Sequence, residues 1–132
     1  MSLSVLVVDD NKADQFISEH VIKNYDATIR IDKAYDGKEA LDMLSHEDYV
    51  PHYIFLDINM PRMDGMEFLE AYHKLDNHSS IIVMLTSSVR EDDYSRCMAY
   101  PHVKECIPKP LSEEKLTELF SNATELPISK TM

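Results

Sequence analysis

Cysteine, glycine and long apolar runs are scarce in this sequence of 132 residues, and each shortage excludes a class of protein. The two cysteines, Cys97 and Cys106, form no C-x-x-C pair, so we expect core thiols in a reducing cytoplasm and no disulfide framework. No stretch approaches the roughly 20 apolar residues of a membrane span. The first residues, MSLS, lack the basic and apolar regions of a signal peptide. The sequence therefore predicts a cytoplasmic protein without membrane insertion.

Basic residues are also few, and this argues against a nucleic-acid partner. The chain has 13 lysine and arginine residues against 24 aspartate and glutamate residues, which gives a formal net charge of −11. Such a surface repels a phosphate backbone. The length suits a single domain with its own core. We therefore predict one acidic domain that does not bind nucleic acid.

Apolar runs of strand length alternate with segments of helical spacing along the chain. The strand candidates are residues 3–8, 28–34, 53–56, 81–85 and 104–107. The helix candidates are residues 13–25, 38–46, 66–75, 91–100 and 113–123. Strands that alternate with helices in this way predict an α/β fold with a parallel sheet.

The composition of each strand candidate indicates its place in the sheet. LSVLVV, YIFL and IIVML are continuous apolar runs, which is typical of strands buried on both faces. TIRIDKAY alternates with polar residues and VKECIP is short and contains a proline, so these two belong at the edges. The simplest arrangement is a doubly wound, five-stranded parallel sheet in the order 2-1-3-4-5 with five helices, the flavodoxin-like class.

Periodic apolar positions predict which face of two helices packs on the sheet. In the first helix, the residues that share the apolar face are Phe16, Ile17, Val21 and Tyr25. In the last helix, the corresponding residues are Leu116, Leu119, Phe120 and Ala123. We expect both sets to lie in the core.

Acidic and other polar residues stand where the apolar runs stop. Asp9 and Asp10 follow the first run, Asp57 follows the third, Thr86 the fourth and Lys109 the fifth. The carboxyl ends of parallel strands share one edge of a sheet, and ligands bind there at the point where the strand order reverses. The sequence therefore predicts that these side chains meet at one site.

The chemistry of such a site follows from its charges. Carboxylates held close together repel one another unless a cation offsets them. Mg²⁺ is the natural cation, because it takes oxygen ligands, commonly one or two carboxylates with waters and a substrate phosphate. A carboxylate in that setting can attack a phosphorus atom. We therefore expect a magnesium and phosphoryl site.

The residues of this chain argue against three other functions. A calcium-binding EF-hand loop that begins at Asp57 needs glycine at its sixth position, where Arg62 stands. A haloacid-dehalogenase-type phosphatase needs a second acid where Asn59 stands, and an amide is no general acid. A flavin site needs a phosphate-binding loop after the first strand, but the only glycines are Gly37 and Gly65.

Four strings in this chain resemble, in order and spacing, the receiver domain of two-component response regulators. They are VLVVDD, FLDINMPRMDG, MLTSS and IPKPL. The resemblance covers about residues 3–123, so we assign residues 1–124 to a receiver domain. Residues 125–132 form a short tail, and we expect no output domain and a stand-alone, chemotaxis-type receiver.

The resemblance implies a role for each acid. Asp57 would be the phosphoacceptor, and Asp10 would bind Mg²⁺ directly. Asp9 would act mainly through metal-bound water. The main-chain carbonyl of Asn59 would complete the protein ligands of the metal. The histidine that donates the phosphoryl group would lie on a partner, a sensor histidine kinase or a histidine phosphotransfer protein.

The resemblance also implies roles for the later strings. The Thr86 hydroxyl would bind a phosphoryl oxygen, and Lys109 would balance the acids and then the phosphate. The Lys109-Pro110 peptide bond would be cis. Asp64 would start a helix, and Gly65 would supply permissive backbone for the turn before it.

One position departs from the family pattern. Where receivers usually carry an aromatic residue that turns inward on activation, three positions before Lys109, this chain has Cys106. We therefore expect the signal from Thr86 to reach the face of the fourth helix, fifth strand and fifth helix by a different rearrangement. Tyr94, Met98 and Tyr100 are the candidates for filling the space that the inward-turning aromatic ring occupies in other receivers.

The sequence thus predicts a phosphorylation switch that catalyses only its own phosphorylation and dephosphorylation and is not a turnover enzyme. Its output would be a docking protein or onward phosphate transfer in a relay. It would be a monomer or a weak, phosphorylation-dependent dimer. The alternative is a pseudo-receiver that binds partners without being phosphorylated.

Overall fold

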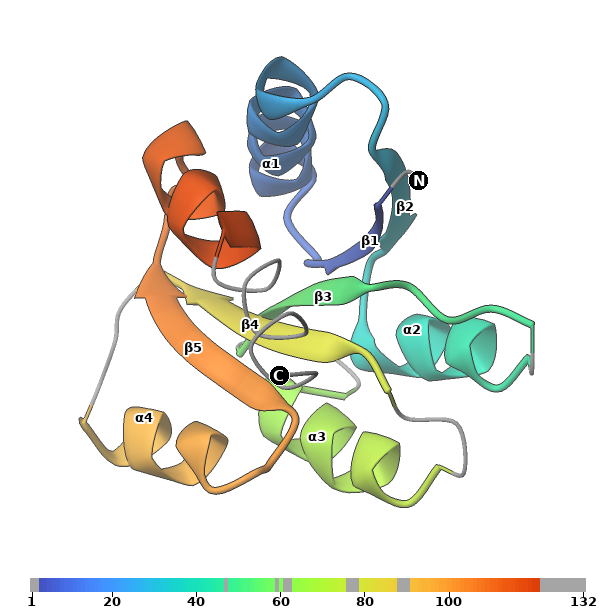
Figure 1. Cartoon of the computed structure of the whole chain (residues 1–132). Coiled ribbons are helices and arrows are strands. Elements are labelled where there is room, and N and C mark those ends of the chain that lie inside the picture. The colour runs from blue at the N-terminus through green and yellow to red at the C-terminus, as the bar shows by residue number, and fades with distance from the viewer. Residues whose placement is uncertain are drawn as a thin grey trace, which may run out of the picture.

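The computed structural model describes residues 3–46, 48–58, 60, 63–75, 79–87 and 91–121. It contains one sheet of five parallel strands in the order β2-β1-β3-β4-β5, as predicted (Figure 1). The strands are β1 (Ser4–Val8), β2 (Arg30–Ala34), β3 (Tyr53–Asp57), β4 (Ile81–Thr86) and β5 (Val103–Pro108). The helices are α1 (Lys12–Tyr25), α2 (Gly37–Leu44), α3 (Gly65–His73), α4 (Glu91–Met98) and a last helix over 113–121.

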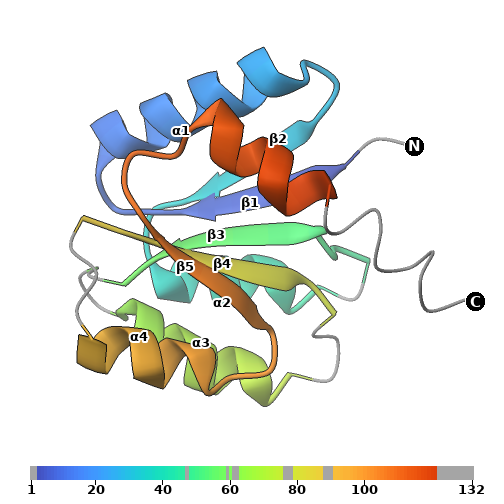
Figure 2. The same cartoon turned by 60° about the vertical axis from the view of Figure 1, so that its left-hand side comes forward.

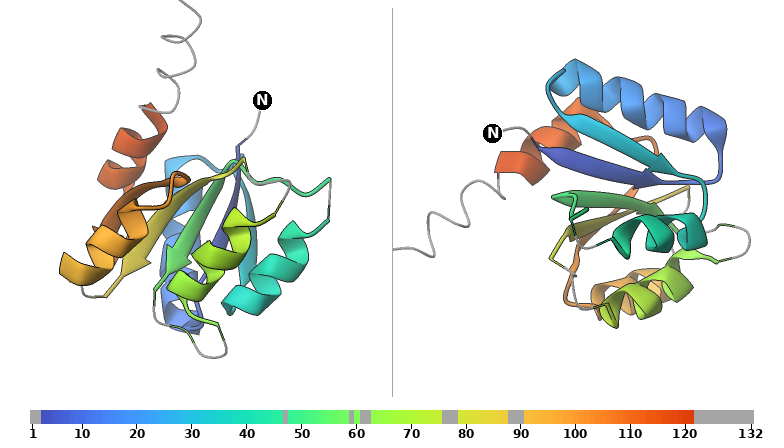
Figure 3. Two further views of the ribbon diagram at one scale, coloured as in Figure 1. Left: turned by 90° about the horizontal axis from the view of Figure 1, so that it is seen from below. Right: turned by 90° about the vertical axis from the view of Figure 1, so that its right-hand side faces the viewer.

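The helices cover both faces of the sheet. Helix α1 and the last helix lie on one face, and α2, α3 and α4 lie on the other (Figure 2). The views from below and from the side show the same three layers (Figure 3). Both faces of the central strands are therefore buried, which explains why β1, β3 and β4 read as continuous apolar runs.

Alternate side chains along each strand point to opposite faces of the sheet and belong to two separate cores. Leu6 and Val8 of β1 belong to the core beneath α2, α3 and α4. Val5 and Val7 belong to the core beneath α1 and the last helix. In the last helix Leu116, Leu119 and Phe120 are buried as predicted, and Ala123 lies outside the described residues. Both cysteine side chains are buried, also as predicted.

The prediction for the core face of α1 was right for Val21 and Tyr25, which pack against the core beneath α1 and the last helix, and wrong for Phe16 and Ile17. Phe16 is 67% exposed and Ile17 is 41% exposed, whereas Gln15, Ser18 and Ile22 are buried. Apolar periodicity could not find the N-terminal part of this face, because a glutamine occupies its most buried position near the helix start. The Nε2 of that glutamine donates hydrogen bonds to main-chain carbonyl groups at the strand ends.

Polar side chains define several helix starts. The Asn11 side chain caps α1 by accepting a hydrogen bond from the Asp14 N–H, so the cap is neither of the two preceding acids. Asp64 and Glu67 form a capping box at α3. Among the described residues, no helix is long and apolar enough to cross a membrane.

Candidate functional site

The carboxyl ends of β1 and β3 bring three aspartates together. Asp9, Asp10 and Asp57 each offer a carboxylate oxygen, and these oxygens lie within 4.8 Å of one another. Asp9 and Asp57 are buried, with 2% and 6% exposure, while Asp10 is exposed. The cluster is therefore open to solvent on the Asp10 side and closed on the side of the sheet. Asn59 lies outside the described residues.

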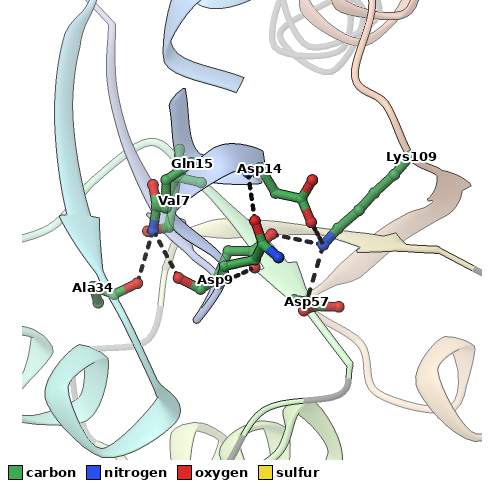
Figure 4. Close-up of polar contacts among 8 residues, drawn as sticks. Val7, Asp9, Asp14, Gln15, Ala34, Asp57 and Lys109 are labelled. Carbon is green, nitrogen blue, oxygen red and sulfur yellow. Dashed lines mark hydrogen bonds and ion pairs between the residues drawn. The ribbon is translucent and has the colours of Figure 1, made fainter. Parts of the chain in front are cut away.

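Lys109 supplies the positive charge of the cluster. Its Nζ lies 2.7 Å from Asp9 Oδ2 and 3.5 Å from Asp57 Oδ2 (Figure 4). The Lys109 N–H donates to the Thr86 carbonyl at 2.8 Å, which joins the segment after β5 to the end of β4. The Lys109-Pro110 bond is cis, as the resemblance implied.

The ammonium group of Lys109 remains charged in this setting. Burial disfavours the charged form, but hydrogen bonds to Asp14 and Asp9 and the charges of Asp57 and Asp9 outweigh that cost. Together they raise the pKa of Lys109 above its usual value. Lys109 therefore acts as a fixed positive charge at the pocket and not as a proton donor.

A fourth acid, Asp14, was not predicted from the sequence. It lies in the first turn of α1, and its Oδ2 is 2.8 Å from Lys109 Nζ (Figure 4). The signal that could have found it is its position in the first turn of a helix that starts directly after Asp9 and Asp10. Lys109 is thus shared between Asp9 after β1, Asp57 of β3 and Asp14 of α1.

Gln15, the next residue of α1, holds the strand ends in place. Its Nε2 donates to the carbonyl groups of Val7, Asp9 and Ala34 at 2.9, 3.2 and 2.9 Å. Its Oε1 is the buried side-chain oxygen that has no hydrogen-bond partner in the described part of the chain. This amide links the ends of β1 and β2 and so fixes the backbone that carries Asp9 (Figure 4).

Gly65 lets the start of α3 approach the end of β3. A Cβ added at Gly65 would lie 2.7 Å from the Asp57 carbonyl oxygen and 2.8 Å from Ile58 Cα. The Gly65 N–H donates to the Ile58 carbonyl at 2.7 Å. Neither described glycine has a positive φ, so the expectation of permissive backbone was wrong. The position requires glycine because the two backbone segments are close.

The other predicted site residues are Thr86 at the end of β4, Cys106 within β5 and Tyr100 between α4 and β5. Thr86 is fully buried and pairs with Pro108, and Cys106 pairs with Met84. Cys106 belongs to the core beneath α2, α3 and α4, and Tyr100 and Met98 pack against that core, whereas Tyr94 is 45% exposed. Tyr100 also lines a hollow of about 280 Å³ with Met66, Arg96 and Ala99.

The donor set fits a hard divalent cation. Three aspartates from two neighbouring strand ends offer oxygen ligands, which Mg²⁺ prefers over nitrogen or sulfur. Lys109 pairs with Asp9, Asp14 and Asp57, and Asp10 adds a fourth carboxylate, so the charge of these described side chains remains negative. A cation at Asp9, Asp10 and Asp57 would offset that charge.

Comparisons with known proteins agree with one another. The sequence model of the response regulator receiver domain matches residues 5–121. The probable methanogenesis regulatory protein FilR2 of Methanothrix harundinacea is 35% identical over 126 residues, which cover 92% of this chain and 81% of that protein. The sensor histidine kinase CheAY of Helicobacter pylori is 32% identical over 123 residues, 92% of this chain but 15% of the kinase.

The structure of a two-component response regulator from Cytophaga hutchinsonii superposes with a TM-score of 0.86 at 25% sequence identity. The match covers 95% of this chain and 99% of that chain. Sequence and fold therefore lead to the same family.

Proposed function

The chain belongs to the response regulator receiver domain family, and we propose that it is a phosphorylation switch whose phosphoacceptor is Asp57. The observation that carries the proposal is the cluster of Asp9, Asp10 and Asp57 with Lys109 at the carboxyl edge of the sheet. Asp57 stands at the end of β3, next to the strand-order reversal where ligands of this fold class bind.

In the proposed reaction an oxygen of the Asp57 carboxylate attacks the phosphorus of a phosphohistidine. A P–O bond forms as the P–N bond breaks, and the electron pair leaves on the imidazole nitrogen, which takes a proton. The product is an acyl phosphate, and its hydrolysis regenerates the carboxylate. The chain catalyses only these steps on itself and turns over no separate substrate.

Mg²⁺ is the proposed cofactor, held by Asp9, Asp10 and Asp57 with the carbonyl of Asn59. When bound, it would neutralise charge that develops on the phosphoryl oxygens. Lys109 would contribute a second positive charge that is already fixed at the pocket by Asp9. Thr86 would donate its hydroxyl hydrogen bond to a phosphoryl oxygen without adding charge.

The phosphorylation signal would be transmitted to a partner through the face formed by α4, β5 and the last helix. Support comes from the main-chain hydrogen bond between Lys109 and Thr86, which ties the end of β5 to the end of β4. Tyr100 and Cys106 both reach the core beneath α4, so a shift of Thr86 could be transmitted there without an aromatic residue at Cys106. The receiver of this signal would be a docking protein or the next protein of a relay.

The proposed phosphodonor is a sensor histidine kinase or a histidine phosphotransfer protein. The relative CheAY is a sensor histidine kinase by name, which supports a donor of this class. As part of the proposal the chain works in the cytoplasm as a monomer or a weak, phosphorylation-dependent dimer. Cys97 and Cys106 are buried and form no disulfide with each other, which is compatible with a reducing compartment.

The test is phosphorylation by a small donor. The protein is incubated with Mg²⁺ and acetyl phosphate, and its intact mass is compared with that of Asp57→Asn. We expect one added phosphoryl group on the wild type alone, and none when Mg²⁺ is chelated. An unmodified wild type that also fails to bind Mg²⁺ and beryllofluoride would contradict the proposal and favour a pseudo-receiver.

A further inference from the structure

We infer that Asp14 is a positioning residue of this site that draws Lys109 toward α1, strengthens cation binding and weakens binding of the phosphoryl group. The inference rests on the proposed function and adds a residue to it. Three acids surround the ammonium group of Lys109, and they are not equivalent. The Nζ is 2.7 Å from Asp9 and 2.8 Å from Asp14, but 3.5 Å from Asp57.

The position of Asp14 is fixed by the start of α1. The Asn11 side chain accepts a hydrogen bond from the Asp14 N–H at 2.9 Å, so the carboxylate stands on an ordered first turn. The Lys109 side chain is 14% exposed and that of Asp14 is 35% exposed. The contact therefore lies at the mouth of the pocket, where one side is protein and the other is solvent.

The distances give Asp14 a direct influence on Lys109. A lysine ammonium group has three N–H donors and no acceptor. Two of its partners, Asp9 and Asp14, lie on the α1 side of the pocket, and only the longer contact reaches the acceptor aspartate. A phosphoryl oxygen on Asp57 would therefore compete with Asp9 and Asp14 for the N–H donors of the ammonium group.

Charge leads to the same result. Asp14 adds a fourth carboxylate to Asp9, Asp10 and Asp57, with Lys109 as the shared cation. This extra negative charge favours a divalent cation and disfavours a phosphoryl group or another anion. Removing it should therefore change the two affinities in opposite directions.

A purely structural role for Asp14 has a different signature. An acid in the first turn of a helix also stabilises the helix through its dipole. Loss of that contribution lowers the stability of the fold. It does not make the folded protein bind one ligand more weakly and another more tightly.

The experiment uses the full chain and four variants. Asp14→Asn removes the charge, and Asp14→Ser is a second neutral variant that suits a helix start. Asp14→Glu keeps the charge. Glu19→Gln is the matched control, because it makes the same charge change on α1, where Glu19 pairs with Lys33 at 2.6 Å. Calorimetry gives the Mg²⁺ affinity, and amide chemical shifts give the beryllofluoride affinity at saturating Mg²⁺.

We expect the neutral Asp14 variants to bind Mg²⁺ about threefold more weakly and beryllofluoride about threefold more tightly, the size of a partly exposed charge interaction. Asp14→Glu and Glu19→Gln should behave like the wild type. Affinities that do not move, that move in the same direction, or that move equally in Glu19→Gln would overturn the inference. A wild type that binds no beryllofluoride would overturn the proposed function itself.

Discussion

Lys109 Nζ lies 2.7 Å from Asp9 Oδ2, although these residues follow strands that β3 and β4 separate in the sheet. The long lysine side chain reaches across the carboxyl edge and joins the two halves of the fold around Asp57 (Figure 4). The contact therefore has two consequences that can be measured separately, one for stability and one for ligand binding.

Replacing Lys109 should destabilise the fold. In Lys109→Met the buried Asp9 and Asp57 lose their ammonium partner, and breaking a buried ion pair costs about 3 kcal/mol. Urea unfolding without divalent cations measures the loss, and Mg²⁺ should recover part of it. The matched control is Lys115→Met, whose pairs with Glu105 and Glu118 are exposed and screened by solvent, so its stability should stay close to that of the wild type. Equal stabilities for the two variants would contradict this account of Lys109.

Neutralising Asp57 should have the opposite effect on the metal-free protein. Its carboxylate lies among like charges, and its contact with Lys109 is the long one. We expect Asp57→Asn to raise the free energy of unfolding by about 1 kcal/mol without Mg²⁺, since like charges at this separation repel. Saturating Mg²⁺ should reverse the order, because the wild type binds the cation more tightly. Asp42→Asn, an exposed acid on α2, is the control and should show neither effect.

Substitution of two neighbouring residues of α1 should change the stability of the fold by very different amounts. Gln15→Leu removes the donor to the carbonyl groups of Val7, Asp9 and Ala34 and should cost about 1–3 kcal/mol. Phe16→Ala removes a ring that is 67% exposed and should change stability by less than about 0.5 kcal/mol. Thermal or urea unfolding of both variants decides the matter. The reverse ranking would mean that Phe16 lies in the core after all.

Gln15 and Phe16 also show which features of the structure can be predicted from the sequence and which cannot. The strands, their order and the meeting of Asp9, Asp10 and Asp57 followed from apolar runs and from the shared edge of a parallel sheet. The N-terminal part of the core face of α1 did not follow, because Gln15 is buried for its hydrogen bonds and not for its hydrophobicity. A polar residue with buried main-chain partners leaves no trace in apolar periodicity.

The role of Asp14 was not predicted, and the reason for Gly65 was predicted wrongly, for a related reason. The contact between Asp14 and Lys109 joins distant parts of the chain, so only the packed structure shows it. Asp64 was correctly placed at a helix start, but the physical reason for Gly65 is a close approach to Asp57 and Ile58 and not an unusual φ. Local sequence reports turn chemistry, whereas such distances depend on how strands and helices pack.

The two glycines should differ in their tolerance of alanine. A Cβ at Gly65 meets the backbone of Asp57 and Ile58, which cannot move without shifting the acceptor strand. At Gly37 the nearest atom, at 2.9 Å, belongs to the Met63 side chain, although the Met63 carbonyl is also close, at 3.0 Å. We expect Gly65→Ala to cost about 2 kcal/mol or more and Gly37→Ala clearly less. Urea unfolding measures both, and amide shifts of Asp57 should change in Gly65→Ala alone.

Identification of the phosphorylated residue tests the central claim most directly. After reaction with acetyl phosphate and Mg²⁺, borohydride reduces an aspartyl phosphate to homoserine, and peptide mass spectrometry locates the changed residue. The account predicts homoserine at position 57 in the wild type and none in Asp57→Asn. Homoserine at Asp9 or Asp10, or a phosphoryl group that borohydride does not remove, would contradict the assignment of Asp57 as the phosphoacceptor.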